Sequence, residues 1–314
     1  MSYESDFLQS LRRLATDPAA RGLTDDAAVL GLGERSLVLT KDLLVEGVHY
    51  LPGDPPADVA WKLLAVNLSD LAAKGARPCG VLLGYSLGEE AWDRAFVEGL
   101  GGALQAFGVA LLGGDTVKAP PGAPRTFSLT AIGEATGAVP SRGGAGAGEQ
   151  LWVSGTIGDA GAGLRSLRGG IDAAQSLIER YRNPRPRLGA GEALAPLVTA
   201  MMDVSDGLLI DAARMAEASG VAVRIDLGDV PLSGAFLEAL GSGRDARLFA
   251  STAGDDYELL FAAPAEAGAE ILRLSERLGL PLSRIGGFAA GAGLRLTDGG
   301  DEVSMPERLG WEHG

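Results

Sequence analysis

The sequence predicts an α/β (α+β) fold made of two α/β domains. Segments with helical spacing of apolar residues alternate with short apolar runs typical of strands, which favours this class over an all-β fold. The chain has 314 residues, 46% of them hydrophobic, which is enough for two domains of ~150 residues with packed cores. The glycine-rich segment 137–148 has the composition of a linker. We therefore expect an N-terminal domain at 1–140 and a C-terminal domain at 149–314.

In the first half, strands are expected at 37–40, 81–85, 109–112 and 127–132, and helices at 58–74 and 92–107. The helix at 58–74 has apolar residues along one face, Gly75 at the position after its end, and Pro78 beyond it. The strand at 109–112 runs into Gly113-Gly114-Asp115-Thr116. Paired glycines after a buried strand indicate a backbone that approaches a ligand closely.

In the second half, strands are expected at 151–154, 201–204, 221–227 and 257–262. The glycine-rich turn 155–163 leads into a helix, and the two prolines at 183–186 end any helix that precedes them. Ser205 is a good N-cap for a helix at 206–219. The second half therefore continues the alternation of helices and strands seen in the first.

Composition excludes several classes of function. The formal charge of −14 and the pI near 4.6 disfavour binding to nucleic acid. One cysteine, Cys79, and two histidines, His49 and His313, exclude an intramolecular disulfide and zinc sites rich in these residues. No apolar run is long enough to span a membrane and the first six residues lack a signal-peptide pattern, so we expect a cytoplasmic protein. The GxxxxGK[ST], GxSxG and HExxH motifs are absent.

Aspartates gather where strands or glycine turns are expected to end: Asp25, Asp26, Asp42, Asp70, Asp115, Asp203, Asp206, Asp255 and Asp256. Ligands bind at such strand ends, and clustered carboxylates need cations. Because oxygen ligands favour Mg²⁺ over zinc, the set predicts a polyphosphate held through magnesium. Simpler interpretations exist for each: Asp70 pairs with Lys74 on an exposed helix face, or Asp206 serves only a helix dipole. Likewise, the arginines at 180, 182, 185 and 187 either contact phosphate or lie in a solvated loop.

A series of motifs in fixed order carries a family resemblance. They are T-D-D-A-A-V-L at 24–30, T-K-D at 40–42, G-V-H at 47–49, A-V-N-L-S-D-L-A-A-K-G-A at 65–76, G-G-D-T at 113–116, S-R-G-G-A at 141–145, D-V-S-D-G-L at 203–208 and G-D-D-Y-E-L at 254–259. In this order they resemble the thiamine-monophosphate kinases, a family of the aminoimidazole ribonucleotide synthetase-like superfamily. The resemblance extends from about Asp6 to Trp311. Single motifs are weak, whereas the ordered set is specific.

The resemblance implies two α/β domains, an N-terminal one that binds ATP and metals and a C-terminal one that completes the phosphate and substrate site, with the N-terminal sheet forming a homodimer interface. It implies phosphorylation of thiamine monophosphate to thiamine diphosphate by ATP, the last step of thiamine diphosphate biosynthesis, with several Mg²⁺ ions. The implied metal site comprises Asp26, Thr40, Lys41, Asp42, Asp70, Asp115, Asp203 and Asp206. ATP would contact Gly114, Asp115, Arg142 and Ser205, and thiamine monophosphate would contact His49, Asp255 and Trp311.

Two positions depart from the family pattern. Lys41 replaces the usual threonine, and its charge either substitutes for part of a metal site or points into solvent, since neighbouring strand residues face opposite sides. Asp255 replaces the usual glutamate and is one methylene shorter. Trp311 either stacks on the thiamine rings or anchors the chain end. No catalytic base is expected, because a phosphate monoester with a second pKa near ~6 is already largely deprotonated at neutral pH.

Two other functions remain open from the sequence. One is another ATP-using synthetase of the same superfamily, although a selenide-using enzyme is disfavoured because the chain lacks a reactive cysteine near its N-terminus. The other is a non-catalytic acidic protein that binds cations, although calcium loops of the D-x-[DN]-x-[DN]-G type are absent. Substrate-dependent release of ADP would distinguish the three.

Overall fold

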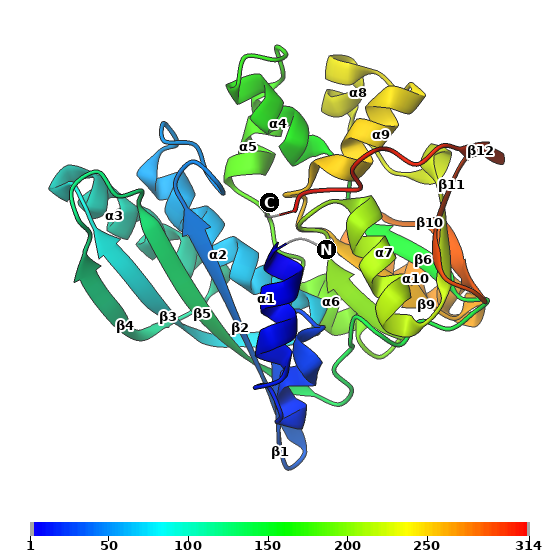
Figure 1. The fold of residues 1–314 in the computed structure, drawn as a ribbon, viewed down its shortest axis with the longest axis horizontal. Coiled ribbons are helices and arrows are strands. Elements are labelled where there is room, and N and C mark those ends of the chain that lie inside the picture. The colour runs from blue at the N-terminus through cyan, green and yellow to red at the C-terminus, as the bar shows by residue number, and fades with distance from the viewer. Residues whose placement is uncertain (1–2, 313–314) are drawn as a thin grey trace.

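The structure, a computed structural model, describes residues 3–312, with side chains described from Phe7 onward (Figure 1). Residues 1–2 and 313–314, and with them His313, lie outside the described part of the chain. Within the described part, the strands form two sheets, and helices pack against both. No helix in this part is long and apolar enough to cross a membrane. The predicted α/β class with two units is confirmed.

The first sheet is built from residues 28–136 in the order β1-β2-β5-β3-β4. Its strands are β1 (Ala28–Leu32), β2 (Arg35–Val45), β3 (Arg77–Leu87), β4 (Leu111–Lys118) and β5 (Thr126–Thr136). All neighbours are antiparallel except β3 and β4, which run parallel. The helices α2 (Pro56–Ala73) and α3 (Glu90–Phe107) pack on each other and enclose an apolar core against this sheet. This unit contains every N-terminal motif of the predicted site.

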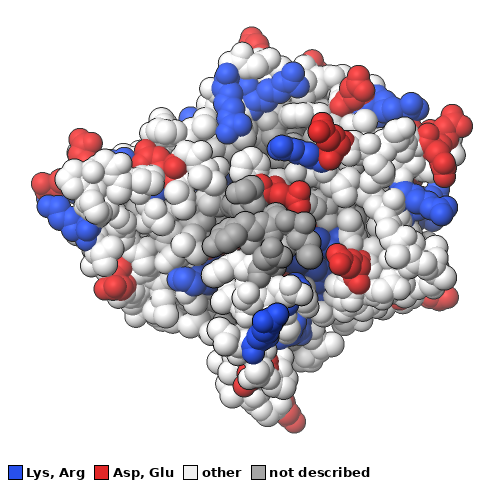
Figure 2. Space-filling view, in the orientation of Figure 1, with Lys and Arg blue, Asp and Glu red and all other residues white. Residues whose placement is uncertain are grey.

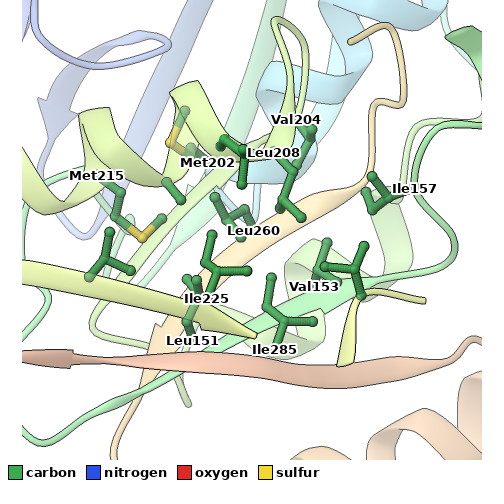
Figure 3. Packing of buried hydrophobic residues seen from close by; sticks show 14 of the residues in the cluster. Leu151, Val153, Ile157, Met202, Val204, Leu208, Met215, Ile225, Leu260 and Ile285 are labelled. Carbon is green, nitrogen blue, oxygen red and sulfur yellow. The ribbon is translucent and has the colours of Figure 1, made fainter. Parts of the chain in front are cut away.

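The second sheet is built from residues 150–303 in the order β12-β11-β8-β10-β6-β9-β7. Its strands are β6 (Gln150–Ser154), β7 (Ala200–Asp203), β8 (Ala222–Asp226), β9 (Leu259–Ala263), β10 (Leu282–Ala289), β11 (Gly293–Asp298) and β12 (Asp301–Val303). On one face, α7 (Leu208–Ser219) closes a core in which Met202, Met215, Leu260 and Ile285 interdigitate (Figure 3). On the other face, α6 (Leu188–Leu194) and α10 (Gly268–Leu278) cover a second core.

The remaining helices lie around this second unit and across the front of the molecule. They are α1 (Tyr3–Arg12), α4 (Asp159–Leu167), α5 (Gln175–Arg182), α8 (Gly234–Leu240) and α9 (Arg244–Ala253). In Figure 1, α4, α5, α8 and α9 stand together above the second sheet. Helix α4 packs on both α5 and α9, so these helices form one connected group.

Helix α2 belongs to both units. Its residues Leu63, Leu64 and Leu68 are fully buried in the core of the first sheet. Its last turn, Ala72–Ala73, is buried in the second core together with Met201. A helix that is apolar all round is typical of a fully buried position. The predicted single apolar face was therefore too narrow a description of this helix.

Every predicted strand overlaps an observed strand, and the predicted helices at 58–74 and 92–107 correspond to α2 and α3. Gly75 has a φ of 60°, the left-handed conformation expected after the end of α2. The prediction of a buried strand before the G-G-D-T motif is wrong. Strand β4 begins at Leu111, includes 113–116, and is exposed along its whole length at the sheet edge.

The predicted N-cap of α7 is also wrong. The helix begins at Leu208 with Gly207 as its N-cap, so Ser205 and Asp206 lie in the preceding turn. The carboxylate of Asp211, inside the helix, accepts hydrogen bonds from the backbone N–H groups of residues 205, 206 and 207 at 3.1–3.2 Å. Because one carboxylate already satisfies these three donors, Ser205 is not required as a cap, and its hydroxyl is left for another role.

Candidate active site

A cavity of about 620 Å³ lies where the two units meet. Its walls come from β2 and the loop after it, from α2 and α4, and from the loops around 203–206 and 253–257. More than half of the predicted site residues line this cavity: Asp42, His49, Asp70, Asp203, Ser205, Asp206, Asp255 and Trp311. Motifs that are distant in the sequence thus converge on one space.

Asp42, Asp70 and Asp203 form the acidic wall of the cavity. Asp42 lies on β2, where its backbone N–H donates to Asn67 Oδ1 at 3.1 Å. Asp70 lies on α2, one helical turn after Asn67, and accepts a hydrogen bond from the hydroxyl of Thr40. Asp203 ends β7 and accepts a hydrogen bond from Ser69 Oγ at 2.6 Å. Helix α2 therefore positions carboxylates from both sheets.

In the described part of the chain, these three carboxylates lie near one another without a cationic side chain beside them, Asp203 buried and Asp42 and Asp70 partly buried. Burial raises the pKa of Asp42 to about 6, against the effect of its hydrogen bond with Asp70. Burial, followed by the charges of Asp42 and Asp203, raises the pKa of Asp70 well above its ordinary value. Burial and the charge of Asp26 raise the pKa of Asp203 to about 8. Within the described residues no ion pair reaches any of the three, so this wall would gain stability from a bound cation.

The donor set suits a magnesium ion that shares its ligands with a substrate better than an ion bound by protein ligands alone. Among the described residues, no group of three or more His, Cys, Asp or Glu is arranged to hold a metal ion by itself. Mg²⁺ usually binds one or two carboxylates together with waters and substrate phosphates. The close pair of Asp42 and Asp70, with Asp203 beside it, fits an ion whose other ligands come from a nucleotide.

Asp26 does not line the cavity, although its charge acts on Asp42, Asp70 and Asp203, and its carboxylate is already paired. Its carboxylate forms ion pairs with Lys74, at 2.7 Å, and with Arg142. Burial alone would raise the pKa of Asp26, but the charges of Lys74 and Arg142 together lower it. Neighbouring Asp25 is bound by Lys74 and Arg21 at 2.5 Å each. The prediction that Lys74 pairs with Asp70 on an exposed helix face is wrong, because Lys74 is fully buried and points to Asp25 and Asp26.

The loop with Asp255 is held in an unusual conformation. Asp255 and Tyr257 have φ values of 62° and 51°, and the backbone N–H of Asp255 donates to Ser205 O at 2.7 Å. Left-handed backbone at non-glycine residues is uncommon and gathers at functional sites. Lys62 of α2, only 2% exposed, donates to Asp255 Oδ2 at 2.9 Å and to His49 O at 3.0 Å. One buried ammonium thus connects two of the residues predicted to contact the substrate.

The segment with Trp311 also lines the cavity. The backbone N–H of Trp311 donates to Asp206 O at 2.9 Å, and the Trp311 side chain is half exposed. The Asp206 carboxylate is paired with Arg214 of α7, which also binds Asp211 at 3.0 Å. Trp311 therefore lies where a planar ring in the cavity could stack on it, while its backbone also anchors the tail. In the face shown in Figure 2, acidic and basic side chains are interspersed rather than gathered by sign.

Besides Asp26, Thr40 and Arg142, which do not line the cavity, three more predicted residues lie away from it. Lys41 is exposed, and its Nζ donates to Ser128 Oγ on β5 at 3.1 Å, so its side chain points away from the acidic wall. Gly114 and Asp115 are exposed on β4, at the far edge of the first sheet (Figure 1). A Cβ on Gly114 would lie 1.9 Å from Leu83 O of β3, so strand packing by itself explains this glycine.

The arginines near 183–186 have mostly structural partners. Arg180 and Arg187 both bind the fully buried Glu258. Arg182 binds Asp54 at 2.8 Å. These three side chains therefore fit neither of the two predictions, that they contact phosphate or that they lie in a solvated loop. The arginines that line the cavity are instead Arg165, in α4, and Arg168, just after it.

Sequence reasoning missed Lys62, Lys74 and Asp211, which hold the predicted residues in place. The two lysines lie in or directly after a helix whose other residues are mostly apolar. Lysine is almost never fully buried unless it is paired. A lysine within an apolar helix is therefore a signal of a buried acidic partner, although it does not say which one.

Comparisons with known proteins agree with this arrangement. The family model of the AIR synthase related protein, N-terminal domain, matches residues 24–135, and the corresponding C-terminal domain model matches residues 146–299. A thiamine-monophosphate kinase of Caulobacter vibrioides is 41% identical over 99% of this chain and 91% of its own length. The crystal structure of thiamine-monophosphate kinase from Stenotrophomonas maltophilia K279a is 40% identical, with a TM-score of 0.78 over 95% of this chain and 96% of its own. AaThiL complexed with AMPPCP and TMP is 29% identical, with a TM-score of 0.83 over 100% of this chain and 99% of its own.

The fold and the paired domain models define an AIR synthase related protein. Identity at this level over nearly the full length narrows the assignment further. The chain belongs to the thiamine-monophosphate kinase family.

Proposed function

We propose that the chain transfers the γ-phosphoryl group of ATP to the phosphate of thiamine monophosphate, giving ADP and thiamine diphosphate in the last step of thiamine diphosphate biosynthesis. The observation that carries this proposal is the convergence of Asp42, Asp70 and Asp203 with His49 and Asp255 on one cavity. A site for two phosphate-bearing reactants needs cation-binding carboxylates beside a pocket for the organic part of the acceptor, and this cavity supplies both.

The chemistry requires positioning more than proton transfer. The acceptor is a phosphate monoester, which is already largely deprotonated at neutral pH because its second pKa is near ~6. In-line transfer then depends on alignment and on neutralising charge between the reactants. Mg²⁺ held by these carboxylates would supply that neutralisation. We assign Asp42, Asp70, Asp203 and Asp206 as its ligands, with Thr40 orienting Asp70, and no residue as a general base.

The organic part of the acceptor would contact the other side of the cavity. Trp311 offers an aromatic face to the thiazolium or pyrimidine ring, and stacking of a cation on tryptophan is favourable. His49 and Asp255 provide polar contacts, held in place by Lys62. Ser205, no longer needed as a helix cap, and Arg142 are assigned to ATP. An ATP-using biosynthetic role of this kind favours the cytoplasm.

We further propose a homodimer through the first sheet. The sheet edge around β4 exposes Leu82, Leu111, Leu112 and Val117. Exposed apolar side chains gathered at one edge of a sheet are typical of an interaction surface. Gly114 and Asp115 lie on the same strand, so they could take part in nucleotide or metal binding only where a second copy covers this edge.

A coupled ADP-release assay tests the activity. We expect Mg²⁺-dependent release of ADP with thiamine monophosphate, together with formation of thiamine diphosphate, and no release with free thiamine or with aminoimidazole ribonucleotide precursors. Equal activity on free thiamine would contradict the mechanism, because its hydroxyl acceptor needs a general base and the proposed mechanism uses none. Activity only on an amidine ribonucleotide would instead assign the chain to another synthetase of the superfamily.

A further inference from the structure

Two groups of carboxylates flank α2, and their charge is balanced in opposite ways. Asp42, Asp70 and Asp203 have no ion pair within residues 3–312. Asp25 and Asp26 are contacted by three cationic side chains, from Arg21, Lys74 and Arg142. The first group thus lacks positive charge, whereas the second has one positive charge more than it has negative charges.

The ammonium group of Lys74 is enclosed by oxygen atoms in this position. Its Nζ lies 2.5 Å from Asp25 Oδ1, 2.7 Å from Asp26 Oδ2 and 3.1 Å from the backbone oxygen of Met201. It donates hydrogen bonds to Asp25 Oδ1 and Met201 O and forms an ion pair with Asp26 Oδ2, which accepts no hydrogen bond within the described chain. The lysine side chain is fully buried, and the carboxylates of Asp25 and Asp26 are 1% and 4% exposed. A group so enclosed is a fixed part of the site and not a mobile surface cation.

The two oxygens of Asp26 face different cations. Asp26 Oδ1 accepts a hydrogen bond from Arg142, whose backbone N–H in turn donates to Asp25 Oδ1 at 3.2 Å, whereas Oδ2 has the ion pair with Lys74 and no hydrogen bond from any described residue. A divalent ion bound to Asp26 would have to share this carboxylate with Lys74 and Arg142 or displace one of them, and would add two charges to a group that is already net positive. Removing a buried ammonium from its partners carries a large electrostatic cost.

We propose that Lys74 is a built-in cation for the Asp25–Asp26 pair, and that Asp26 in this chain binds no divalent ion. The inference rests on the proposed function, because the ions concerned are those of the kinase reaction, and it replaces the expectation that Asp26 is a metal ligand. The divalent ions then gather on the cavity side of α2, at Asp42, Asp70, Asp203 and Asp206, where the first three have no ion pair among the described residues. The Lys74–Met201 hydrogen bond also fixes the cation between the two units.

Counting bound Mn²⁺ tests this division without measuring turnover. The number of Mn²⁺ ions per chain is measured with saturating AMPPCP, from the loss of the free-ion electron paramagnetic resonance signal, for wild type, Asp26→Asn, Asp42→Asn and the exposed control Asp172→Asn. We expect Asp26→Asn and Asp172→Asn to bind as many ions as wild type and Asp42→Asn to bind one fewer. Loss of one ion in Asp26→Asn would overturn the inference.

Lys74→Met gives a second measurement. Without the ammonium, the Asp25–Asp26 pair should accept one Mn²⁺ more than wild type, and an unchanged count in the folded variant would overturn the inference. If Lys74→Met does not fold, the comparison of Asp26→Asn with Asp42→Asn decides by itself. If Asp42→Asn keeps every ion while Asp26→Asn loses none, the inference stands and the metal assignment within the proposed function falls. Failure of the wild type to release ADP would reject the proposed function and leave the ion counts interpretable.

Discussion

Replacing Lys62 with methionine should weaken the binding of thiamine monophosphate without unfolding the protein. Methionine keeps most of the side-chain volume but removes the ammonium, which donates to Asp255 Oδ2 at 2.9 Å and to His49 O at 3.0 Å. It also lies 4.0 Å from the centre of the Tyr181 ring. Asp255 keeps one partner, the hydroxyl of Tyr257 at 3.1 Å. Among the described residues, the loop around Asp255 then loses its only ion pair with α2.

The magnitude follows from these contacts. A hydrogen bond to a charged group contributes about 1.5–3 kcal/mol. Because the Asp255 side chain is 29% exposed, water replaces part of the lost bond, so we take the lower end, about 1.5–2 kcal/mol. Every ~1.4 kcal/mol is tenfold in affinity. The KM for thiamine monophosphate should therefore rise about 10- to 30-fold, while the KM for ATP stays near its wild-type value.

Steady-state kinetics with each substrate varied in turn provide the assay, with Arg273→Met as the control. Arg273 is an exposed cation on α10 whose ion pair with Glu270 lies on the surface, and such pairs contribute little. Circular dichroism confirms the fold of both variants. A KM for thiamine monophosphate within twofold of wild type in folded Lys62→Met would refute the role of Lys62. Equal losses for both substrates would show general damage instead of positioning.

Three further results are expected. Gly191→Ala, whose new Cβ would lie 1.9 Å from a backbone oxygen of α2, should lower the free energy of unfolding by about 1–3 kcal/mol in denaturant titrations, whereas Gly189→Ala, with open space around it in the same helix, should not. In metal-free protein, folding raises the pKa of Asp42 to about 6 and that of Asp203 to about 8. Protonation of these groups therefore stabilises the folded state fully below the unfolded pKa of 3.8, and this stabilisation is lost as the pH rises to about 8. The melting temperature should therefore fall as the pH rises over that range and should increase again when Mg²⁺ is added. A melting temperature that does not change with pH would refute the raised pKa values of these carboxylates. Lys41→Thr should leave the Mg²⁺ titration unchanged, because its side chain is bound to β5, and a titration shifted several-fold would contradict this.

The sequence predicted the elements and the list of acidic residues better than their partners. Local patterns were sufficient for α2, α3 and eight of the strands, because spacing and end signals are encoded within a few residues, whereas β1, β10, β11 and β12 were not predicted. The partners are remote: Lys62 and Asp255 are 193 positions apart, and Ser69 and Asp203 are 134 apart. No local pattern encodes such a contact. The error at β4 has a similar cause, because an apolar strand at an exposed edge has the same composition as a buried one.

Helix α2 accounts for most of what local patterns could not supply. From Lys62 to Lys74 the chain advances twelve residues, about 18 Å at 1.5 Å per residue. Lys62 lies at one end, beside Asp255, Asp70 lies between, and Lys74 lies at the other end beside Asp25. Because both cores hold the same helix, its backbone is fixed against both sheets at once. The spacing of Lys62 and Lys74 along α2 therefore sets the distance between the substrate end of the site, at Asp255, and the end with the built-in cation, at Asp25. This distance does not depend on the conformation of the loops.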